Sequence, residues 1–199
     1  MKIVLATANA HNVAEIKAIF ENIGGFEILT AEEVGFTAEI DEVGKTFEAN
    51  SLIKAKIVSE FCGLPAVADD SGLAVDFLGG APGVHSARFG GEGLSAAEKN
   101  KKIVALLDGV EPKDRTAHFV SVVTLYMPNG RVLAVRGECD GIILLQPEGD
   151  CGFGYDPLFY YPPLGKTFAQ MGAEAKNAVS HRAKALHEFA KQLPGFLNS

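Results

Sequence analysis

The sequence lacks tryptophan, a pair of closely spaced cysteines and any apolar run long enough to cross a membrane. A transmembrane helix needs about 20 consecutive apolar residues, so we expect no membrane partner. Cys62, Cys139 and Cys151 are odd in number and form no Cys-x-x-Cys pair. A disulfide framework and a zinc site are therefore both disfavoured, and a reducing, cytoplasmic location is predicted.

An excess of basic residues is also missing. The chain has 18 Lys and Arg residues against 25 Asp and Glu residues, which gives a net charge of −7. A protein that coats nucleic acid normally presents a basic face, so this balance argues against nucleic acid as a partner. The charge is uneven, because residues 1–100 carry 7 basic against 15 acidic residues, whereas residues 101–199 carry 11 against 10.

Apolar residues, in contrast, are abundant enough for a large core. They make up 47% of the 199 residues, and a chain of this length buries about 70% of its unfolded surface. No internal repeat or low-complexity linker divides the chain, and its opening residues MKIVLATANA are typical of a buried strand rather than of a signal peptide. We expect one domain, residues 1–199, made of two lobes on a continuous sheet.

Strand and helix patterns alternate along the chain. The tract Pro128-Asn129-Gly130 lies between two strand patterns and predicts a β-hairpin. This interleaved order with one hairpin predicts an α/β fold with a mixed sheet. The predicted strands are Lys2–Thr7, Phe26–Leu29, Ala66–Ala68, Leu73–Phe77, Thr116–Met127, Val132–Glu138 and Gly141–Leu145. The predicted helices begin after Asn9, run from Thr46 to Phe61, begin after the capping box of Ser95 and Glu98, and run from Lys176 to Leu193, where Pro194 ends the last one.

Acidic residues suited to a cation lie in two places. Asp69 and Asp70 follow an apolar strand and precede Ser71-Gly72, which predicts a turn at the rim of the sheet. Mg²⁺ prefers one or two carboxylates together with phosphate and water, so this tract is either a magnesium site or a turn that uses Asp for local hydrogen bonds. Glu42, in the predicted loop Gly35–Gly44, is either a second carboxylate ligand or an ordinary solvated residue.

The tract CGFGYDPLF, residues 151–159, combines two aromatic rings with a carboxylate. Glycines flank Phe153, Tyr155 adds a second ring, and Asp156 precedes a proline, which disfavours helix. Such a loop suits a flat heteroaromatic ligand that stacks on a ring while a polar group reads its edge. The alternative is an aromatic anchor within a core.

Cationic and donor residues gather in KNAVSHR, residues 176–182. Lys176, Ser180, His181 and Arg182 lie where a helix is predicted to begin, and a helix N-terminus favours anions. Arginine also donates bidentate hydrogen bonds to paired oxygen atoms. The tract is either a site for acceptor oxygens or a basic helix turn that faces solvent.

A weaker phosphate signal follows the first predicted strand. The loop Thr7–Asn12 precedes a predicted helix, a geometry that binds phosphate, but it has neither the glycines nor the lysine of a P-loop. Lys54 and Lys56 lie on the second predicted helix, and only one of them is expected to face inward. Ser71 and Ser86 have no paired base, so no nucleophilic triad is predicted.

Together these tracts resemble the inosine triphosphate pyrophosphatase family. Five segments match in the family's order and spacing over nearly the whole chain, namely LATANAHNVAEI, DEVGKTFEANSLIKA, ADDSGLAVDFLGGAPGVHSARF, GFGYDPLF and KNAVSHRAKAL. The resemblance implies an α/β fold of two lobes around a long mixed, twisted sheet with a substrate cleft between them, and a homodimer. It also implies Mg²⁺-dependent hydrolysis of deaminated purine nucleoside triphosphates (ITP, dITP, XTP) to the monophosphate and pyrophosphate.

The resemblance also implies roles for single residues. Asp70 matches the catalytic carboxylate, acting as general base or metal ligand, and Glu42 matches a second ligand of Mg²⁺. Donors opposite the base would favour the O6 acceptor of hypoxanthine and xanthine over the amine of adenine. The positions that match substrate-binding tracts are Thr7, Ala8, Asn9, Ala10, His11 and Asn12 in the first loop, Lys54 and Ser71 near the phosphates, Phe153, Gly154, Tyr155 and Asp156 around the base, and Lys176, His181 and Arg182 on the opposite wall.

The chain departs from the family pattern in its first loop. Ala8 and Asn12 stand where the family has Gly and Lys, so a cation is missing from the expected triphosphate loop. Two alternatives to catalysis on deaminated purines remain, which are a pyrophosphatase for other modified nucleotides and a nucleotide-binding sensor without turnover. The retained Asp69 and Asp70 argue against the sensor.

Overall fold

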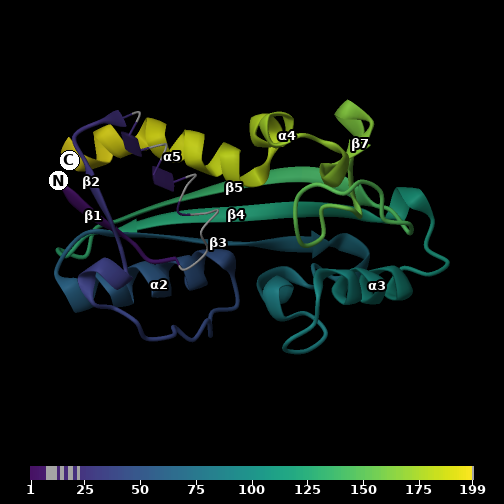
Figure 1. Ribbon diagram of the computed structural model, residues 1–199, viewed down its shortest axis with the longest axis horizontal. Helices are drawn as coiled ribbons and strands as arrows, with labels where there is room; N and C mark the ends of the chain where they lie inside the picture. Colours follow the sequence, from purple (N-terminus) through teal and green to yellow (C-terminus); the bar gives the residue numbers. More distant parts are fainter. Residues whose placement is uncertain (8–12, 14–15, 18–19, 22, 199) are drawn as a thin grey trace. The chain divides into compact units, whose positions relative to one another are not determined.

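A computed structural model describes residues 1–7, 13, 16–17, 20–21 and 23–198 (Figure 1). The chain divides into two compact units. Unit 1 consists of Met1–Asp70, Ser121–Gly137 and Lys184–Ser199, and unit 2 consists of Ser71–Val120 and Glu138–Ala183. In the part of the chain that the structure describes, no helix has the length and apolar character that a membrane span requires.

Seven strands form a mixed sheet in the order β2-β1-β3-β4-β5-β6-β7. Strand β1 pairs in parallel with β2 and β3, whereas β6 pairs antiparallel with β5 and β7. The strands are β1 (Lys2–Leu5), β2 (Glu27–Thr30), β3 (Ala66–Val75), β4 (Thr116–Tyr126), β5 (Val132–Ile143), β6 (Phe159–Tyr161) and β7 (Lys166–Thr167). The predicted α/β fold with a mixed sheet is confirmed.

Four α-helices and six short 3₁₀ helices are described in full. The α-helices are α2 (Phe47–Cys62), α3 (Ala96–Leu106), α4 (Ala173–Val179) and α5 (His181–Asn198). The 3₁₀ helices are η1 (Glu32–Val34), η2 (Asp76–Leu78), η3 (Gly83–Arg88), η4 (Pro112–Asp114), η5 (Pro162–Leu164) and η6 (Phe168–Gln170). The predicted capping box of Ser95 and Glu98 is present at α3, and Thr46, predicted as the first residue of the second helix, caps α2 instead. Asn9, the predicted first cap, lies outside the described residues.

Unit 1 is a three-layer sandwich in which helices cover both faces of the strands. Successive side chains of a strand point to opposite faces. Ile3 of β1 therefore packs in one apolar cluster with Phe189 of α5, while Val4 packs in another with Val58 of α2. Figure 1 shows α2 and α5 on opposite faces of these strands. A side chain's position in β1 or β3 thus decides which helix it meets.

Unit 2 is built around a cluster of aromatic rings. Phe119 of β4 lies with its ring centroid 4.5 Å from that of Phe159 and 5.6 Å from that of Phe168. Leu73 of β3 and Ile103 of α3 belong to the same buried cluster. Aromatic pairs at these distances stabilise a core beyond their burial, and this core anchors the segments that follow β5.

The turn predicted at Asp69-Asp70-Ser71-Gly72 is wrong, because β3 runs unbroken from Ala66 to Val75. Asp, Ser and Gly are common in turns, and the local composition therefore favoured one. However, β3 lies between β1 and β4 in the sheet, so its backbone groups need partners on both sides. A continuous extended strand provides these partners, and the turn preference of four residues is overridden.

Gly141 does not begin a separate strand, as the sequence predicted, but lies within β5 (Val132–Ile143). A side chain at this position would meet the Phe159 ring at 2.5 Å and the Tyr160 carbonyl oxygen at 2.6 Å. The glycine is therefore required by the close approach of β6, and it marks no break in the strand.

The single helix predicted for Lys176–Leu193 is also wrong. It is divided at Ser180, which is extended (φ −67°, ψ 155°) and whose hydroxyl accepts a hydrogen bond from the Ala183 amide at 3.2 Å. Ser180 therefore caps α5. Pro194 lies inside α5 rather than ending it, because Leu193 and Phe196 beside it pack against the core of unit 1, and this burial offsets the missing proline donor.

Candidate functional site

The first group of predicted site residues lies in unit 1 and surrounds Asp70. Ala66 and Ala68 of β3 pack in the same cluster as Val58 of α2, and strand alternation places Asp70 on that face of the sheet. Its carboxylate is buried and accepts two hydrogen bonds from α2. Lys54 Nζ donates to Oδ1 at 3.1 Å, and Asn50 Nδ2 donates to Oδ2 at 3.3 Å.

Lys54 joins Asp70 to the second predicted carboxylate. Its Nζ also donates to Glu42 Oε1 at 2.8 Å, and Glu42 belongs to the predicted loop Gly35–Gly44. The two acidic residues that sequence reasoning singled out thus meet at one positive charge, although Asp70 does so from a strand and not from a turn. Lys54 is the inward-facing lysine, since Lys56 pairs with Glu60 on the exposed side of α2.

Burial and charge oppose each other in this group. Burial alone would lower the pKa of Lys54, but the carboxylates of Asp70, Glu42 and Asp69 together outweigh it and raise that pKa. Burial, assisted by the negative charge of Glu42, raises the pKa of Asp70 in spite of the hydrogen bonds from Lys54 and Asn50. A divalent cation would favour the ionised form of this carboxylate. No set of three or more metal-ligating side chains occurs among the residues described, and within that part of the chain Lys54 brings together the carboxylates of Glu42 and Asp70.

The second group lies in unit 2 and holds the aromatic loop. The Asp156 carboxylate is 2% exposed and accepts from the Phe153 amide at 2.8 Å and from Lys176 Nζ at 2.6 Å. A side chain at Gly152 would lie 2.1 Å from Asp156 Oδ2, so only glycine permits this contact. The Phe153 ring is 53% exposed, and Lys176 Nζ lies 4.6 Å from its centroid. The arrangement presents the Phe153 ring at the surface of unit 2, while the Lys176 ammonium lies largely covered between this ring and Asp156.

Tyr155, in contrast, belongs to the core of unit 2. Its ring is buried, and its hydroxyl donates to the Ser86 carbonyl oxygen at 2.8 Å. Burial raises its pKa to about 12. Of the two readings of this tract, the core anchor holds for Tyr155, while the exposed ring of Phe153 fits a ligand contact.

The third group, also in unit 2, surrounds the junction of α4 and α5. The His181 ring is buried and stacks on Phe119, with ring centroids 4.8 Å apart and planes 12° from parallel. Arg182 Nη2 donates to Ser71 Oγ at 3.2 Å. Ser71, predicted to lie near phosphates, therefore contacts this arginine. Of the two interpretations of this tract, the basic helix turn that faces solvent does not form, because Ser180, His181 and Arg182 are all buried.

The predicted first loop is described only at Thr7, which is partly buried and follows β1. Ala8, Asn9, Ala10, His11 and Asn12 lie outside the described residues, so their predicted contact with a triphosphate stays a prediction.

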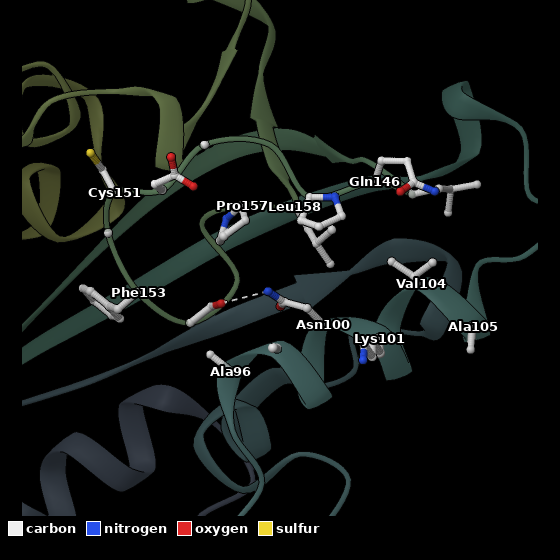
Figure 2. Close-up of a pocket in the computed structure, with 17 residues that line it drawn as sticks. Ala96, Asn100, Lys101, Val104, Ala105, Gln146, Cys151, Phe153, Pro157 and Leu158 are labelled. Carbon is white, nitrogen blue, oxygen red and sulfur yellow. Dashed lines mark hydrogen bonds between the residues drawn. The ribbon is translucent and has the colours of Figure 1, made fainter.

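A cavity of about 770 Å³ lies in unit 2 between α3 and the aromatic loop (Figure 2). Helix α3 and the segment from Leu145 to Leu158 line it, and it includes Phe153 and Gly154. Asn100 of α3, which is 8% exposed, donates from Nδ2 to the Gly154 carbonyl oxygen at 3.1 Å, the bond dashed in Figure 2. Helix α3 thus holds the loop that carries Phe153.

Comparison with known proteins assigns the chain to a family. The profile of the Ham1 family matches residues 3–192. The chain belongs to the Ham1 family. A relative from Desulforamulus reducens named dITP/XTP pyrophosphatase is 48% identical to this Ham1-family chain over 186 residues, which cover 94% of this chain and 92% of that protein. One of the same name from Lactobacillus acidophilus is 45% identical over 196 residues, and 97% of each chain is covered.

Solved structures agree with the Ham1 assignment. A HAM1 protein from Coxiella burnetii is 36% identical, with a TM-score of 0.93 over 98% of this chain and 99% of that one. A nucleoside-triphosphatase / dITP/XTP pyrophosphatase from Mycobacterium abscessus is 40% identical, with a TM-score of 0.84 over 95% of this chain and 98% of that one. The family resemblance and the α/β fold predicted from the sequence are both confirmed.

Sequence reasoning missed two asparagines of this Ham1-family protein. Asn50 on α2 and Asn100 on α3 are buried, and each hydrogen-bonds to a predicted site segment. The available signal was spacing, since Asn50 lies one helical turn before Lys54. A polar residue on the inward face of an amphipathic helix needs a buried partner. Here the partners are the Asp70 carboxylate for Asn50 and the Gly154 carbonyl oxygen for Asn100.

Proposed function

We propose that this protein hydrolyses deaminated purine nucleoside triphosphates, such as dITP, XTP and ITP, to the monophosphate and pyrophosphate, and so removes them from the nucleotide pool. The observation that carries the proposal is the meeting of Glu42, Lys54 and Asp70 in a Ham1-family chain whose near full-length relatives are named dITP/XTP pyrophosphatases. Phosphoryl-transfer sites use carboxylates to hold a cation and an ammonium group to bind phosphate. Here the ammonium group contacts both carboxylates.

The residues present fit a bound Mg²⁺. Glu42 and Asp70 supply two hard oxygen donors, and Lys54 Nζ contacts both, which means that both carboxylates already reach one positive centre. Bound Mg²⁺ would neutralise charge on the triphosphate. Mg²⁺ typically keeps several waters and is held by one or two carboxylates plus substrate phosphate, so two protein ligands are sufficient.

Asp70 and Lys54 are assigned the chemistry at the phosphates. Water attacks the α-phosphorus, the bond to the bridging oxygen breaks, and pyrophosphate leaves with the electron pair of that bond. Asp70 accepts the proton of the attacking water or holds the metal, and its raised pKa brings it closer to the range of a useful general base. Lys54 stabilises the negative charge of the phosphates.

Base selection is assigned to the groups of unit 2. The exposed Phe153 ring offers a stacking surface, while Lys176, His181 and Arg182 carry donors. A 6-oxo purine accepts hydrogen bonds at O6 where adenine presents an amine, and a buried donor that faces an amine is left unpaired. Donor-rich surroundings therefore favour hypoxanthine and xanthine over adenine.

Assembly and location complete the proposal. The protein is expected to act as a homodimer, as the resemblance to its family implies, and in the cytoplasm, where its three free cysteines would stay reduced. Light scattering coupled to gel filtration tests the dimer, because a monomeric mass at micromolar concentration would contradict it.

The deciding experiment measures pyrophosphate release from dITP, XTP, ITP, GTP and ATP with and without Mg²⁺. We expect turnover of the three deaminated nucleotides, at least tenfold lower kcat/KM for ATP, and turnover at least 100-fold lower in EDTA. Preference for another modified nucleotide would support the alternative pyrophosphatase, and binding without release would support a sensor. Either result would overturn the proposal.

The variant Asp70→Asn separates catalysis from binding. The amide keeps the size of the carboxylate but cannot accept the proton or match its charge, so kcat should fall at least 100-fold while dITP binding stays measurable by calorimetry. Asp76→Asn, at an acidic residue paired with His118 in unit 2, is the matched control and should keep kcat within twofold. An Asp70→Asn enzyme with wild-type kcat would remove Asp70 from the chemistry.

A further inference from the structure

The amide of Asn50 lies between the loop that carries Glu42 and the carboxylate of Asp70. Asn50 Oδ1 accepts from the Gly44 amide at 2.8 Å, and Nδ2 donates to Asp70 Oδ2 at 3.3 Å. Its side chain is fully buried. Both ends of the amide are therefore occupied, one by the loop two residues beyond Glu42 and the other by the carboxylate.

The chemistry of the partners fixes the orientation of this amide. A backbone N–H can only donate, so the Asn50 atom that faces Gly44 must be the oxygen. The NH₂ group then faces Asp70, whose carboxylate can only accept when ionised. An aspartate at position 50 would put a second carboxylate there, and an apolar residue would leave the Gly44 N–H unpaired.

The same contact restricts position 44 to glycine. A side chain at this position would lie 2.4 Å from Asn50 Oδ1 and 2.8 Å from the Ala49 Cβ. Because both distances are far below van der Waals contact, the loop can approach α2 this closely only with glycine. The hydrogen bond from Gly44 to Asn50 thus explains a glycine that no turn requires.

Asn50 and Lys54 hold different oxygens of Asp70. They lie one turn apart on the same face of α2, and Lys54 contacts Oδ1 while Asn50 contacts Oδ2. Lys54 is a charged partner that would compete with a cation for Asp70 and Glu42. Asn50 is neutral, so its hydrogen bond to Asp70 adds no positive charge that would repel a cation.

We propose that Asn50 is a positioning residue that couples the Glu42 loop to Asp70 and keeps both carboxylates aimed at one cation. The inference rests on the proposed function for its kinetic consequence, but its structural part concerns the cation alone. Residues that orient metal ligands typically change metal affinity or activity by 10–100-fold when removed. The role differs from that of Asp70, because Asn50 acts only through the carboxylate and the loop.

The test titrates the metal-free protein with Mn²⁺ in the absence of nucleotide and follows free Mn²⁺ by electron paramagnetic resonance. Asn50→Ala removes both hydrogen bonds, and Gly44→Ala forces the loop away while leaving Asn50 in place. Both should weaken Mn²⁺ binding at least tenfold. In dITP hydrolysis, both should lower kcat at subsaturating and saturating Mg²⁺, with the KM for dITP changed less than threefold.

Ser51→Ala is the matched control. Ser51 is also fully buried, adjoins Asn50 on α2, and shares a hydrogen bond of 2.7 Å with the hydroxyl of Thr124. Its removal should lower the thermal midpoint in a similar way and leave Mn²⁺ affinity within twofold. A merely structural role for Asn50 predicts equal Mn²⁺ affinity in Asn50→Ala and Ser51→Ala.

The outcomes separate this inference from the proposed function. Unchanged Mn²⁺ affinity in Asn50→Ala, or an equal loss in Ser51→Ala, would overturn the positioning role even if the wild-type enzyme releases pyrophosphate. If Asn50→Ala does not fold, the Gly44→Ala result decides in its place. A wild-type protein that binds Mn²⁺ but releases no pyrophosphate would overturn the proposed function and leave the Mn²⁺ comparison intact as a test of Asn50.

Discussion

Two ion pairs between buried side chains in this protein join residues that are distant in sequence. Lys54 precedes Asp70 by 16 positions, and Lys176 follows Asp156 by 20. A buried ionised group is costly unless a partner and hydrogen bonds compensate for its desolvation. Each of these pairs therefore requires the correct fold before it contributes anything, and each makes the local structure sensitive to the loss of one partner.

The Lys176–Asp156 pair gives the largest expected effect of a single change on stability. Lys176→Met leaves a carboxylate that is 2% exposed with only the Phe153 amide as donor, which should cost about 3–5 kcal/mol in the free energy of unfolding. The double variant Lys176→Met/Asp156→Asn should recover part of this loss. Urea unfolding measures both.

An exposed pair serves as the control for this prediction. Lys2 and Glu27 lie 3.2 Å apart with more than half of each side chain exposed, so Lys2→Met should cost less than about 1 kcal/mol. Equal losses for Lys2→Met and Lys176→Met would contradict the importance of burial.

His118 predicts a dependence of stability on pH. Its Nδ1 lies 2.9 Å from Asp140 Oδ1 and its Nε2 lies 3.1 Å from Asp76 Oδ1, so both nitrogens can donate when the ring is charged. The hydrogen bond with Asp140 raises the pKa of His118, and Asp76 adds to it against partial burial. Because this pKa is higher in the folded state, the stabilisation is fully present below about pH 6.5, the unfolded value, and is lost as pH rises through the folded value.

The variant His118→Gln tests this sign. Its deficit in unfolding free energy relative to the wild type should be largest near pH 6 and should shrink towards pH 9, measured by urea unfolding at each pH. His187→Gln, at an exposed histidine of α5, controls for the loss of an imidazole as such. A deficit that grows with pH would contradict the ionic contacts of His118.

At the scale of elements, two glycines allow one element to pack closely against another. Gly141 allows β6 to lie against β5, and Gly44 allows the Glu42 loop to lie against α2. Neither glycine has a left-handed backbone, unlike Gly35 and Gly63, which end helices. Both glycines are required because the element packed against each of them leaves no room for a side chain.

Gly141→Ala should therefore destabilise the protein through steric overlap. The added methyl group would lie 2.6 Å from the backbone oxygen of Tyr160, which cannot move as a side chain can. Overpacking of this kind costs about 1–3 kcal/mol, visible as a lower thermal midpoint. Gly195→Ala is the control, because nothing lies within 4 Å of that position and alanine is the better residue inside a helix. It should be neutral or stabilising, and the reverse order of the two variants would refute the steric explanation.

At the scale of the whole molecule, the net charge of −7 opposes the binding of a polyanion. The proposed Mg²⁺ at Glu42 and Asp70 would offset the repulsion of a nucleoside triphosphate locally. The hydrogen-bond donors of unit 2 would do the same. The overall charge thus bears on nucleic-acid binding, which needs an extended basic face, and not on a small anion held by a few groups.

Removal of the metal distinguishes coordination by a cation from neutralisation of charge alone. With EDTA in excess, pyrophosphate release from dITP should fall at least 100-fold, and Mg²⁺ should restore it. Spermine is a polycation that neutralises phosphate but offers no coordination, so it should not restore turnover. Recovery with spermine would mean that charge neutralisation alone suffices and would contradict a coordinated cation.

Local signals explain which parts of the fold the sequence predicted well. The Ser95 capping box and the turn after β4, both predicted, are each formed by residues within a few positions of one another. Such signals act before tertiary contacts form. The family resemblance predicted Glu42 and Asp70 as two metal ligands, and that role stays a prediction, although both carboxylates contact Lys54.

Distant partners explain what was missed. The continuity of β3 depends on its place between β1 and β4, and the passage of α5 through Pro194 depends on the core beneath it. The roles of Asn50 and Asn100 depend on Asp70 and Gly154, which lie 20 and 54 positions away. No window of local sequence contains both members of such a pair.

The sequence alone therefore determined the absence of a long apolar segment, the class of the fold, the capping box of α3 and the acidic and basic tracts, because composition and short-range spacing encode them. The tertiary structure decided that Asp70 lies in a strand, that Lys54 rather than Lys56 faces it, and that Asn50 completes its contacts. The physical reason is that a carboxylate becomes a site only when burial and its partners fix its direction, and those partners come from other elements of the fold.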